Sequence, residues 1–121
     1  MNKKRLTICL LFSFILLSSC TSIASLPQEP ATPVSNTLQS LSIYEAHLSS
    51  YVMYLQTFLV KTKEKFRDKD YPQFSFFDAT LLKKTHTIDA VKQNIEHLKH
   101  YISITKPIVN SIYKKYSKLK K

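Results

Sequence analysis

The most restrictive feature of this 121-residue sequence is that it contains no glycine. Average usage near 7% would place roughly eight glycines in a chain of this length. Phosphate-binding loops, nucleophile elbows and type I′ or II′ hairpin turns need glycine, because their backbones adopt positive φ angles or approach another group closely. We therefore expect none of these motifs, and the sequence predicts an all-α fold of helices joined by turns without glycine.

Two stretches of the chain repeat apolar residues at alternating steps of three and four, which is the spacing of one helix face. The first stretch contains Leu41, Tyr44, Leu48, Tyr51, Leu55 and Phe58. The second contains Ile88, Val91, Ile95, Leu98 and Ile102, and continues through Thr105, Val109, Ile112, Tyr116 and Leu119. The second stretch resembles a coiled-coil heptad, so the sequence predicts a small helical hairpin or three-helix bundle with coiled-coil-like packing.

Capping residues and a proline set the expected limits of these helices. Asn36 or Ser42 can cap the first helix, and Asp78 can cap the second. Pro107 lacks the N–H that a helix interior requires, so it predicts a kink or a new start with Thr105 as the cap. We expect three helices, near 37–69, 78–104 and 106–119.

The first predicted helix has more apolar surface than one amphipathic face needs. Around its middle, additional apolar residues widen the stripe: Val52, Met53, Tyr54, Leu59 and Val60. A lone helix in water would not tolerate this surface. We expect the helix to be sandwiched between other helices or to lie at an oligomer interface.

An aromatic segment, Tyr71-Pro72-Gln73-Phe74-Ser75-Phe76-Phe77, follows the charged end of the first predicted helix. Pro72 disfavours helical geometry in the residue before it, so the segment predicts a turn. Its four aromatic side chains can form an exposed recognition tip, or they can fold back to close the end of a helical hairpin. We favour the second interpretation.

The N-terminal residues have the three parts of a secretory signal: a positive start, an apolar run over 6–17 and two small residues. Twelve apolar residues span only about 18 Å as a helix, short of the ~30 Å hydrocarbon core of a bilayer. This length argues against a permanent transmembrane helix.

The segment Leu17-Ser18-Ser19-Cys20 resembles the lipobox of bacterial lipoproteins, in which an aliphatic residue and two small residues precede the cysteine that becomes lipidated. The resemblance covers only the leader. It implies that Leu17, Ser18 and Ser19 are recognised by the signal peptidase, and that Cys20 carries two or three acyl chains as a stable membrane anchor. An ordinary signal cleaved after Ala24 and an uncleaved anchor are the alternatives.

The predicted organisation is a signal peptide at 1–19, a lipidated cysteine with a flexible linker at 20–35, and a helical domain at 36–121. The linker carries Pro27, Pro30 and Pro33, spaced by the three residues of a polyproline II turn. We expect an extended spacer that lifts the domain from the headgroups. A ligand for a proline-binding groove is the less favoured alternative.

The exported part of the chain is basic. Without the three cations of the leader, 15 Lys and Arg residues stand against 8 Asp and Glu residues, a net charge of about +7. The lysines accumulate at the C-terminus: Lys114, Lys115, Lys118, Lys120 and Lys121. They predict an anionic-surface site for lipid or cell-wall polymer. Alternatively, the helix macrodipole favours them there while the apolar residues between them continue the core. Nucleic acid is not expected as a partner outside the cytoplasm.

We predict no catalytic residue, metal site or cofactor. Both cysteines, Cys9 and Cys20, lie within or at the end of the leader, so the domain has no thiolate ligand. His97 and His100 are three residues apart on a predicted helix and can supply two metal ligands, but solvated surface histidines explain them better.

The leading functional hypothesis is a non-enzymatic, membrane-anchored lipoprotein that binds another envelope protein as an assembly or accessory module. A basic module that binds anionic lipid or cell-wall polymer is the first alternative, and a surface adhesion or exclusion protein is another. Thr21 follows the lipidated cysteine, and an Asp there would favour inner-membrane retention in the enterobacterial pattern. The outer membrane is therefore favoured if the organism has one. A homo-oligomer is possible, because heptads suit a dimer as well as a hairpin.

Overall fold

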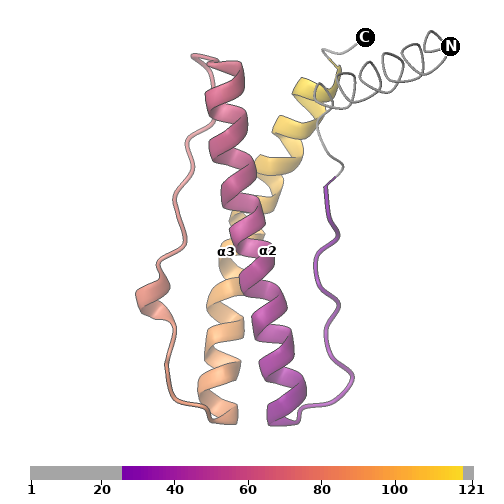
Figure 1. Ribbon diagram of the computed structural model, residues 1–121, viewed down its shortest axis with the longest axis vertical. Helices are drawn as coiled ribbons and strands as arrows, with labels where there is room; N and C mark the ends of the chain where they lie inside the picture. Colours follow the sequence, from indigo (N-terminus) through magenta and orange to yellow (C-terminus); the bar gives the residue numbers. More distant parts are fainter. Residues whose placement is uncertain (1–25, 119–121) are drawn as a thin grey trace, which may run out of the picture.

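The computed structural model describes residues 26–118, which form two long α-helices and no strand. Helix α2 spans Leu38–Phe66 and helix α3 spans Ile88–Ser117. A short 3₁₀ helix, η2, spans Ala79–Leu81 in the connection between them (Figure 1). The predicted all-α fold of packed helices is confirmed, in its two-helix form.

The two helices run in the same direction. Glu45 near the start of α2 contacts Asn94 near the start of α3. At the other end, the rings of Phe66 and Tyr116 stack with their centroids 3.8 Å apart. The chain between the helices must therefore return along their full length, and Figure 1 shows residues 67–87 doing so. The aromatic segment 71–77 is extended chain within this return, where a turn was expected.

The core lies between the helices, and several of its buried apolar residues recur fifty positions apart. Leu48 and Leu98, Val52 and Ile102, and Leu59 and Val109 are all buried. Both helices follow the alternating three- and four-residue steps of a heptad, so matching residues meet at the same height. The predicted coiled-coil-like stripes therefore supply the two halves of one core.

Helix α3 continues through Pro107, so the alternative of a new start there, and with it the third helix near 106–119, is wrong. Thr105, the expected cap, is instead buried inside the helix. A proline in a helix interior costs about 3 kcal/mol. Beyond Pro107, however, α3 buries Val109, Ile112 and Tyr116, and each such side chain contributes roughly 1.5–3 kcal/mol. Packing against α2 outweighs the local penalty.

Threonines cap both helices. The Thr37 side chain accepts from the Ser40 N–H, and the Thr87 side chain accepts from the Ala90 N–H. Asn36 or Ser42 was expected to cap the first helix, but Thr37 caps it instead. Asp78 does cap a helix, but it is the three-residue η2, and the second long helix begins ten residues later than predicted.

Helix α2 ends without glycine. Its C-cap residue, Arg67, adopts the left-handed conformation with φ 45° and ψ 41°, and its N–H donates to the Lys63 carbonyl. Glycine usually occupies such a position because a Cβ disfavours positive φ. The contacts that follow Arg67 in the chain therefore hold a strained residue in place.

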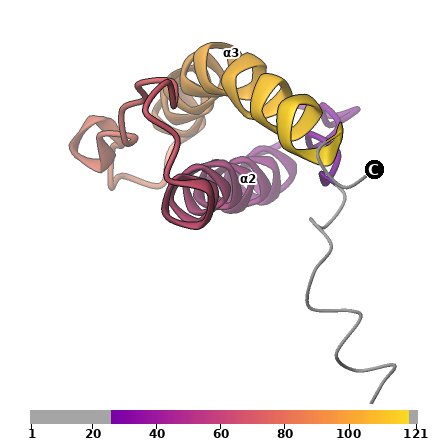
Figure 2. The same cartoon turned by 90° about the horizontal axis from the view of Figure 1, so that it is seen from above.

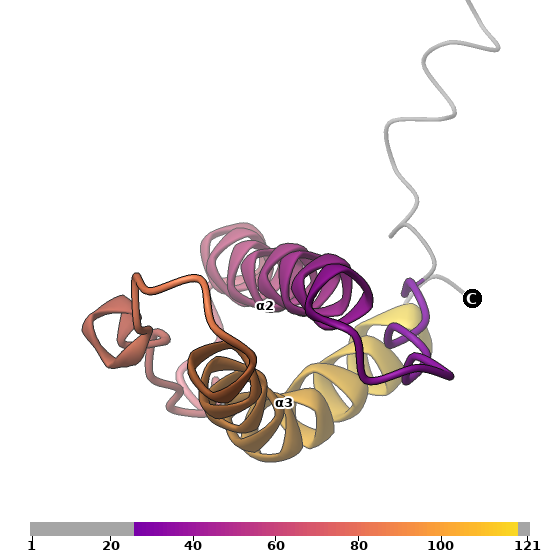
Figure 3. The same cartoon turned by 90° about the horizontal axis from the view of Figure 1, so that it is seen from below.

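Two extended segments flank the helix pair on opposite sides, residues 26–37 on one and residues 67–87 on the other (Figures 2 and 3). They cover part of the surplus apolar surface of α2: Tyr54 lines a cleft with Leu26, and Val60 lines another with Phe74. Val52 and Leu59 belong to the core between the helices. Among the described residues, extended chain therefore takes the place of the expected further helices, whereas an oligomer interface stays a prediction.

The return segment packs through its aromatic residues. Tyr71, Phe74 and Phe77 are half-buried against the core, whereas Phe76 is 64% exposed. The Tyr71 hydroxyl donates to the Leu59 carbonyl at 2.7 Å. Three of the four rings therefore fold back on the helices, as favoured, but they pack along α2 and α3 and do not close the end of a hairpin.

Residues 26–35 are extended, as their prolines predict, but they are not a free spacer. Leu26 packs against the core. The Lys106 ammonium of α3 lies 2.9 Å from the Glu29 carboxylate. The described part of the expected linker is therefore held along the helices.

A buried amide, Asn94, holds the return segment to both helices. Its Nδ2 donates to the Glu45 carboxylate and to the Lys83 carbonyl, both at 2.9 Å, and its Oδ1 accepts from the Lys83 N–H at 2.7 Å. All of its hydrogen-bonding capacity except one acceptor lone pair is used.

Substituting Asn94→Ala should lower the free energy of unfolding by about 1–3 kcal/mol, because the Lys83 backbone groups lose their partners in a partly buried site. The measurement is urea denaturation of the mature protein. The neighbouring exposed Gln93→Ala provides the control and should change stability little. Equal effects of the two substitutions would contradict this role of Asn94.

Candidate functional site

The predicted lysine site lies at the C-terminal end of α3. Lys114 and Lys118 are exposed, and Lys115 is paired with Asp68 from the start of the return segment. The other predicted residues, Lys120 and Lys121 together with Leu17, Ser18, Ser19 and Cys20, lie outside the described residues.

The parallel arrangement brings a second group of cations to the same end. The last turns of α2 and the residues after it carry Lys61, Lys63, Lys65, Arg67 and Lys69, all exposed. We call residues 61–70 and 114–118 the basic end. It holds eight cations and three carboxylates, a net charge of +5.

The remaining described residues, 26–60 and 71–113, are electrically balanced, with five cations and five carboxylates. The whole net charge of the described domain is therefore at one end. The macrodipole favours cations in the last turn of each helix, which accounts for Lys63, Lys65, Lys114 and Lys115. It does not account for Lys61, Arg67, Lys69 or Lys118.

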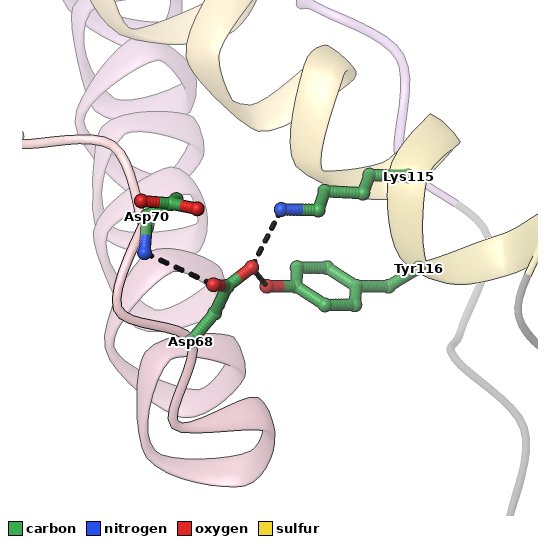
Figure 4. A network of polar contacts seen from close by, with 4 residues as sticks. All are labelled: Asp68, Asp70, Lys115 and Tyr116. Atoms are coloured by element: carbon green, nitrogen blue, oxygen red, sulfur yellow. Dashed lines mark hydrogen bonds and ion pairs between the residues drawn. The ribbon is translucent and has the colours of Figure 1, made fainter.

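Asp68 organises the basic end (Figure 4). Its carboxylate accepts from the Lys115 ammonium at 2.5 Å, from the Tyr116 hydroxyl at 2.8 Å and from the Asp70 N–H at 3.0 Å. These contacts join the start of the return segment to the end of α3. They also follow directly on Arg67, and so they hold its left-handed conformation.

The same contacts favour the charged form of the carboxyl group. The hydrogen bond from Lys115, followed by those from Asp70 and Tyr116, lowers the pKa of Asp68 from 3.8 to about 2. Reciprocally, the hydrogen bond to Asp68 raises the pKa of Lys115. One lysine of the predicted set is therefore engaged in holding the fold together, whereas Lys114 and Lys118 have solvent-exposed side chains.

The N-terminal segment begins nearer the basic end than the opposite end. Leu26 and Pro27 line a cleft together with Tyr54 of α2 and Val109 of α3. Val109 is eight residues before the end of α3 and twenty-one residues after its start. The chain therefore enters the described domain on the basic side of its midpoint.

A second surface lies on the side of α2 that faces away from α3. Between Glu45 and Lys61 the helix has no Asp, Glu, Lys or Arg over fifteen residues, slightly more than four turns. The exposed side chains on this side of the helix, from one turn before this stretch into it, form what we call the α2 outer face: Ile43, Ala46, His47, Ser50, Met53 and Thr57. Met53 is 61% exposed.

The candidate metal ligands lie on the surface of the domain. His97 and His100 are exposed on α3. Among residues 26–118, no group of three or more His, Cys, Asp and Glu side chains is arranged to hold a metal ion.

Comparison with known proteins places the chain in a family. Residues 25–118 match the Borrelia orf-D family. The chain belongs to this family. The sequence is also 53% identical over 118 residues to the outer membrane lipoprotein BBA14 of Borreliella burgdorferi, and the match covers 98% of each chain. The prediction of a lipid-anchored lipoprotein, with the outer membrane as its favoured location, is confirmed.

Neither α2 nor α3 has the length and hydrophobicity needed to cross a bilayer. Cys20 as the lipidated residue stays a prediction, and so do its recognition residues.

Sequence reasoning identified the basic C-terminus but missed that the charges after α2 belong to the same site. Lys61–Asp70 was recognised only as the charged end of the first predicted helix. A signal was present in the repeated pattern His-Leu-x-x-Tyr followed by Val or Ile, at 47–52 and 97–102. Such an internal repeat is compatible with two equivalent helices that pack in register.

Stability should depend on the ionisation of Asp68. Because its folded pKa lies below its unfolded value, its contacts stabilise the protein above about pH 4, and this contribution is lost as the pH falls toward about 2. We expect the melting temperature of the wild type to fall over this window, and Asp68→Asn to remove part of that fall. Asp70→Asn is the control, because Asp70 contributes only its backbone N–H to the network. An identical pH profile for wild type and Asp68→Asn would contradict this account.

Proposed function

We propose that this outer membrane lipoprotein is a non-enzymatic module that binds another envelope protein through the α2 outer face, while acyl chains on Cys20 hold it at the membrane. The observation that carries the proposal is a helix surface slightly more than four turns long, without Asp, Glu, Lys or Arg, on a basic protein. An uncharged surface of this kind suits the centre of a protein interface, where charged residues are depleted.

The side chains of this surface support a protein partner. Exposed Met53 and Ile43 supply apolar area at two levels of the helix. Methionine is unbranched and flexible, so it adapts to the shape of a partner. Ser50 and Thr57 lie between and beyond them and can donate or accept hydrogen bonds. The partner we expect therefore presents an uncharged, partly apolar surface.

The use of the polar groups of the domain supports a non-enzymatic role. Asn94 and Gln56 bind backbone groups of the return segment, at Lys83 and Phe77. Asp68 joins the return segment to α3. These side chains hold the return segment against the helices, so their role is structural.

The substitution Met53→Lys should weaken partner binding at least about tenfold, because a complex would have to bury an unpaired charge at the centre of its interface. The measurement is capture of the partner from detergent-solubilised outer membranes, after photo-crosslinking from a probe at Thr57. Mass spectrometry would identify the captured protein.

The matched control is Ile104→Lys. Ile104 is 55% exposed on α3, so the substitution adds the same charge to an equally exposed apolar position on another face. We expect it to leave capture unchanged. Capture lost equally in both variants, or no specific crosslink from Thr57, would contradict the proposal.

A further inference from the structure

We infer that the basic end rests on the anionic headgroups of the membrane that holds the lipid anchor, so that the helix pair stands on that membrane with its C-terminal ends down. This inference relies on acylation of Cys20 but needs no protein partner. It concerns an electrostatic contact between the unpaired, exposed lysines of the basic end and lipid, in addition to the acyl chains.

The length of the tether limits which end of the domain can reach the membrane. Six peptide links separate Cys20 from Leu26 and span at most about 20 Å when fully extended. Leu26 packs at the level of Val109. From there, the end of α3 at Ser117 is about 12 Å away along the helix, and its start at Ile88 is about 32 Å away. Only the basic end lies within reach of the membrane plane when the helices stand upright.

The charge distribution selects the same end. At physiological ionic strength the Debye length is about 8 Å, so a charged membrane acts only on cations close to its surface. The basic end has a net charge of +5, whereas the rest of the described domain is neutral. An anionic surface therefore attracts this end and leaves the other end unaffected.

The side chains at the basic end are free to make this contact. Lys61, Lys69, Lys114 and Lys118 are exposed. Asp68 pairs with Lys115 and also accepts from the Tyr116 hydroxyl, so its carboxylate already has partners within the domain. The other two carboxylates of the basic end, Glu64 and Asp70, are exposed and are included in its net charge of +5. In this orientation the α2 outer face runs upward from the membrane and is presented sideways.

The test uses the acylated full-length mature protein, reconstituted into phosphatidylcholine vesicles with or without phosphatidylglycerol. A fluorophore is placed on Ser111→Cys near the basic end or on Thr85→Cys near the opposite end, and a nitroxide on the lipid headgroups quenches it. We expect phosphatidylglycerol to raise quenching of the Ser111 probe at least about twofold, and high salt to reverse the increase. The Thr85 probe should show neither change.

Two charge variants make the test specific. Neutralising Lys61, Lys69, Lys114 and Lys118 to Gln should remove the effect of phosphatidylglycerol on the Ser111 probe. Neutralising Lys83, Lys84, Lys92 and Lys99 to Gln removes the same number of charges from the other end and should leave the effect intact. Equal losses in the two variants would mean that net charge alone is responsible and would overturn the inference.

Other outcomes would also overturn it. Quenching that does not depend on phosphatidylglycerol would exclude a headgroup contact and leave the basic end to another anionic partner, such as a cell-wall polymer. Stronger quenching at Thr85 than at Ser111 would mean the reverse orientation. A mature protein without acyl chains on Cys20 would remove the anchor on which the tether length depends. Because the vesicles contain no other protein, failure here is distinct from failure of the α2 interface.

Discussion

The in-register packing of α2 against α3 is the contact on which the rest of this protein depends. Buried pairs such as Leu48 with Leu98 and Val52 with Ile102 place the two helices side by side in the same direction. A parallel pair cannot be joined by a short turn, so the chain must return along the helices. The parallel arrangement also brings the C-termini of both helices, with their cations, to one end of the domain. The connection and the charge distribution are therefore consequences of a single core.

The two extended segments cover apolar surface that the two helices alone would leave exposed. Residues 26–37 and 67–87 lie on opposite sides of the pair and cover apolar surface of α2. Side chains hold them in place at separated points, with Asn94 and Tyr71 on one side and the Glu29–Lys106 ion pair on the other. Without glycine, the chain reverses direction after α2 through the left-handed Arg67, which the Asp68 contacts support.

The spacing of apolar residues and the amino-acid composition predicted the two long helices. Their limits and their relative direction depend on tertiary packing and were not predicted. The apolar stripes correctly identified both long helices and most of their buried residues. The predicted helix start near Pro107 was wrong because the free-energy cost of a proline inside a helix is smaller than the free energy gained by burying the apolar side chains that follow it. Asp78 was predicted to cap the second long helix, but its side chain caps the three-residue η2 instead, because a capping side chain can bind the first turn of a short helix as well as that of a long one. The direction of the second helix depends on contacts far apart in sequence, so the cations after α2 could not be joined to those of α3 from local patterns.

In this member of the orf-D family, the direction of α3 decides which cations and which helix surfaces lie at the same end of the domain. Pulsed electron paramagnetic resonance between nitroxide labels at Lys65 and Lys114 tests that direction most directly. Parallel helices in contact place the two labels within roughly 25 Å of each other, given interaxial distances of about 8–10 Å and the length of the labels. A distance near 40 Å, the separation along an antiparallel pair of this length, would contradict the account.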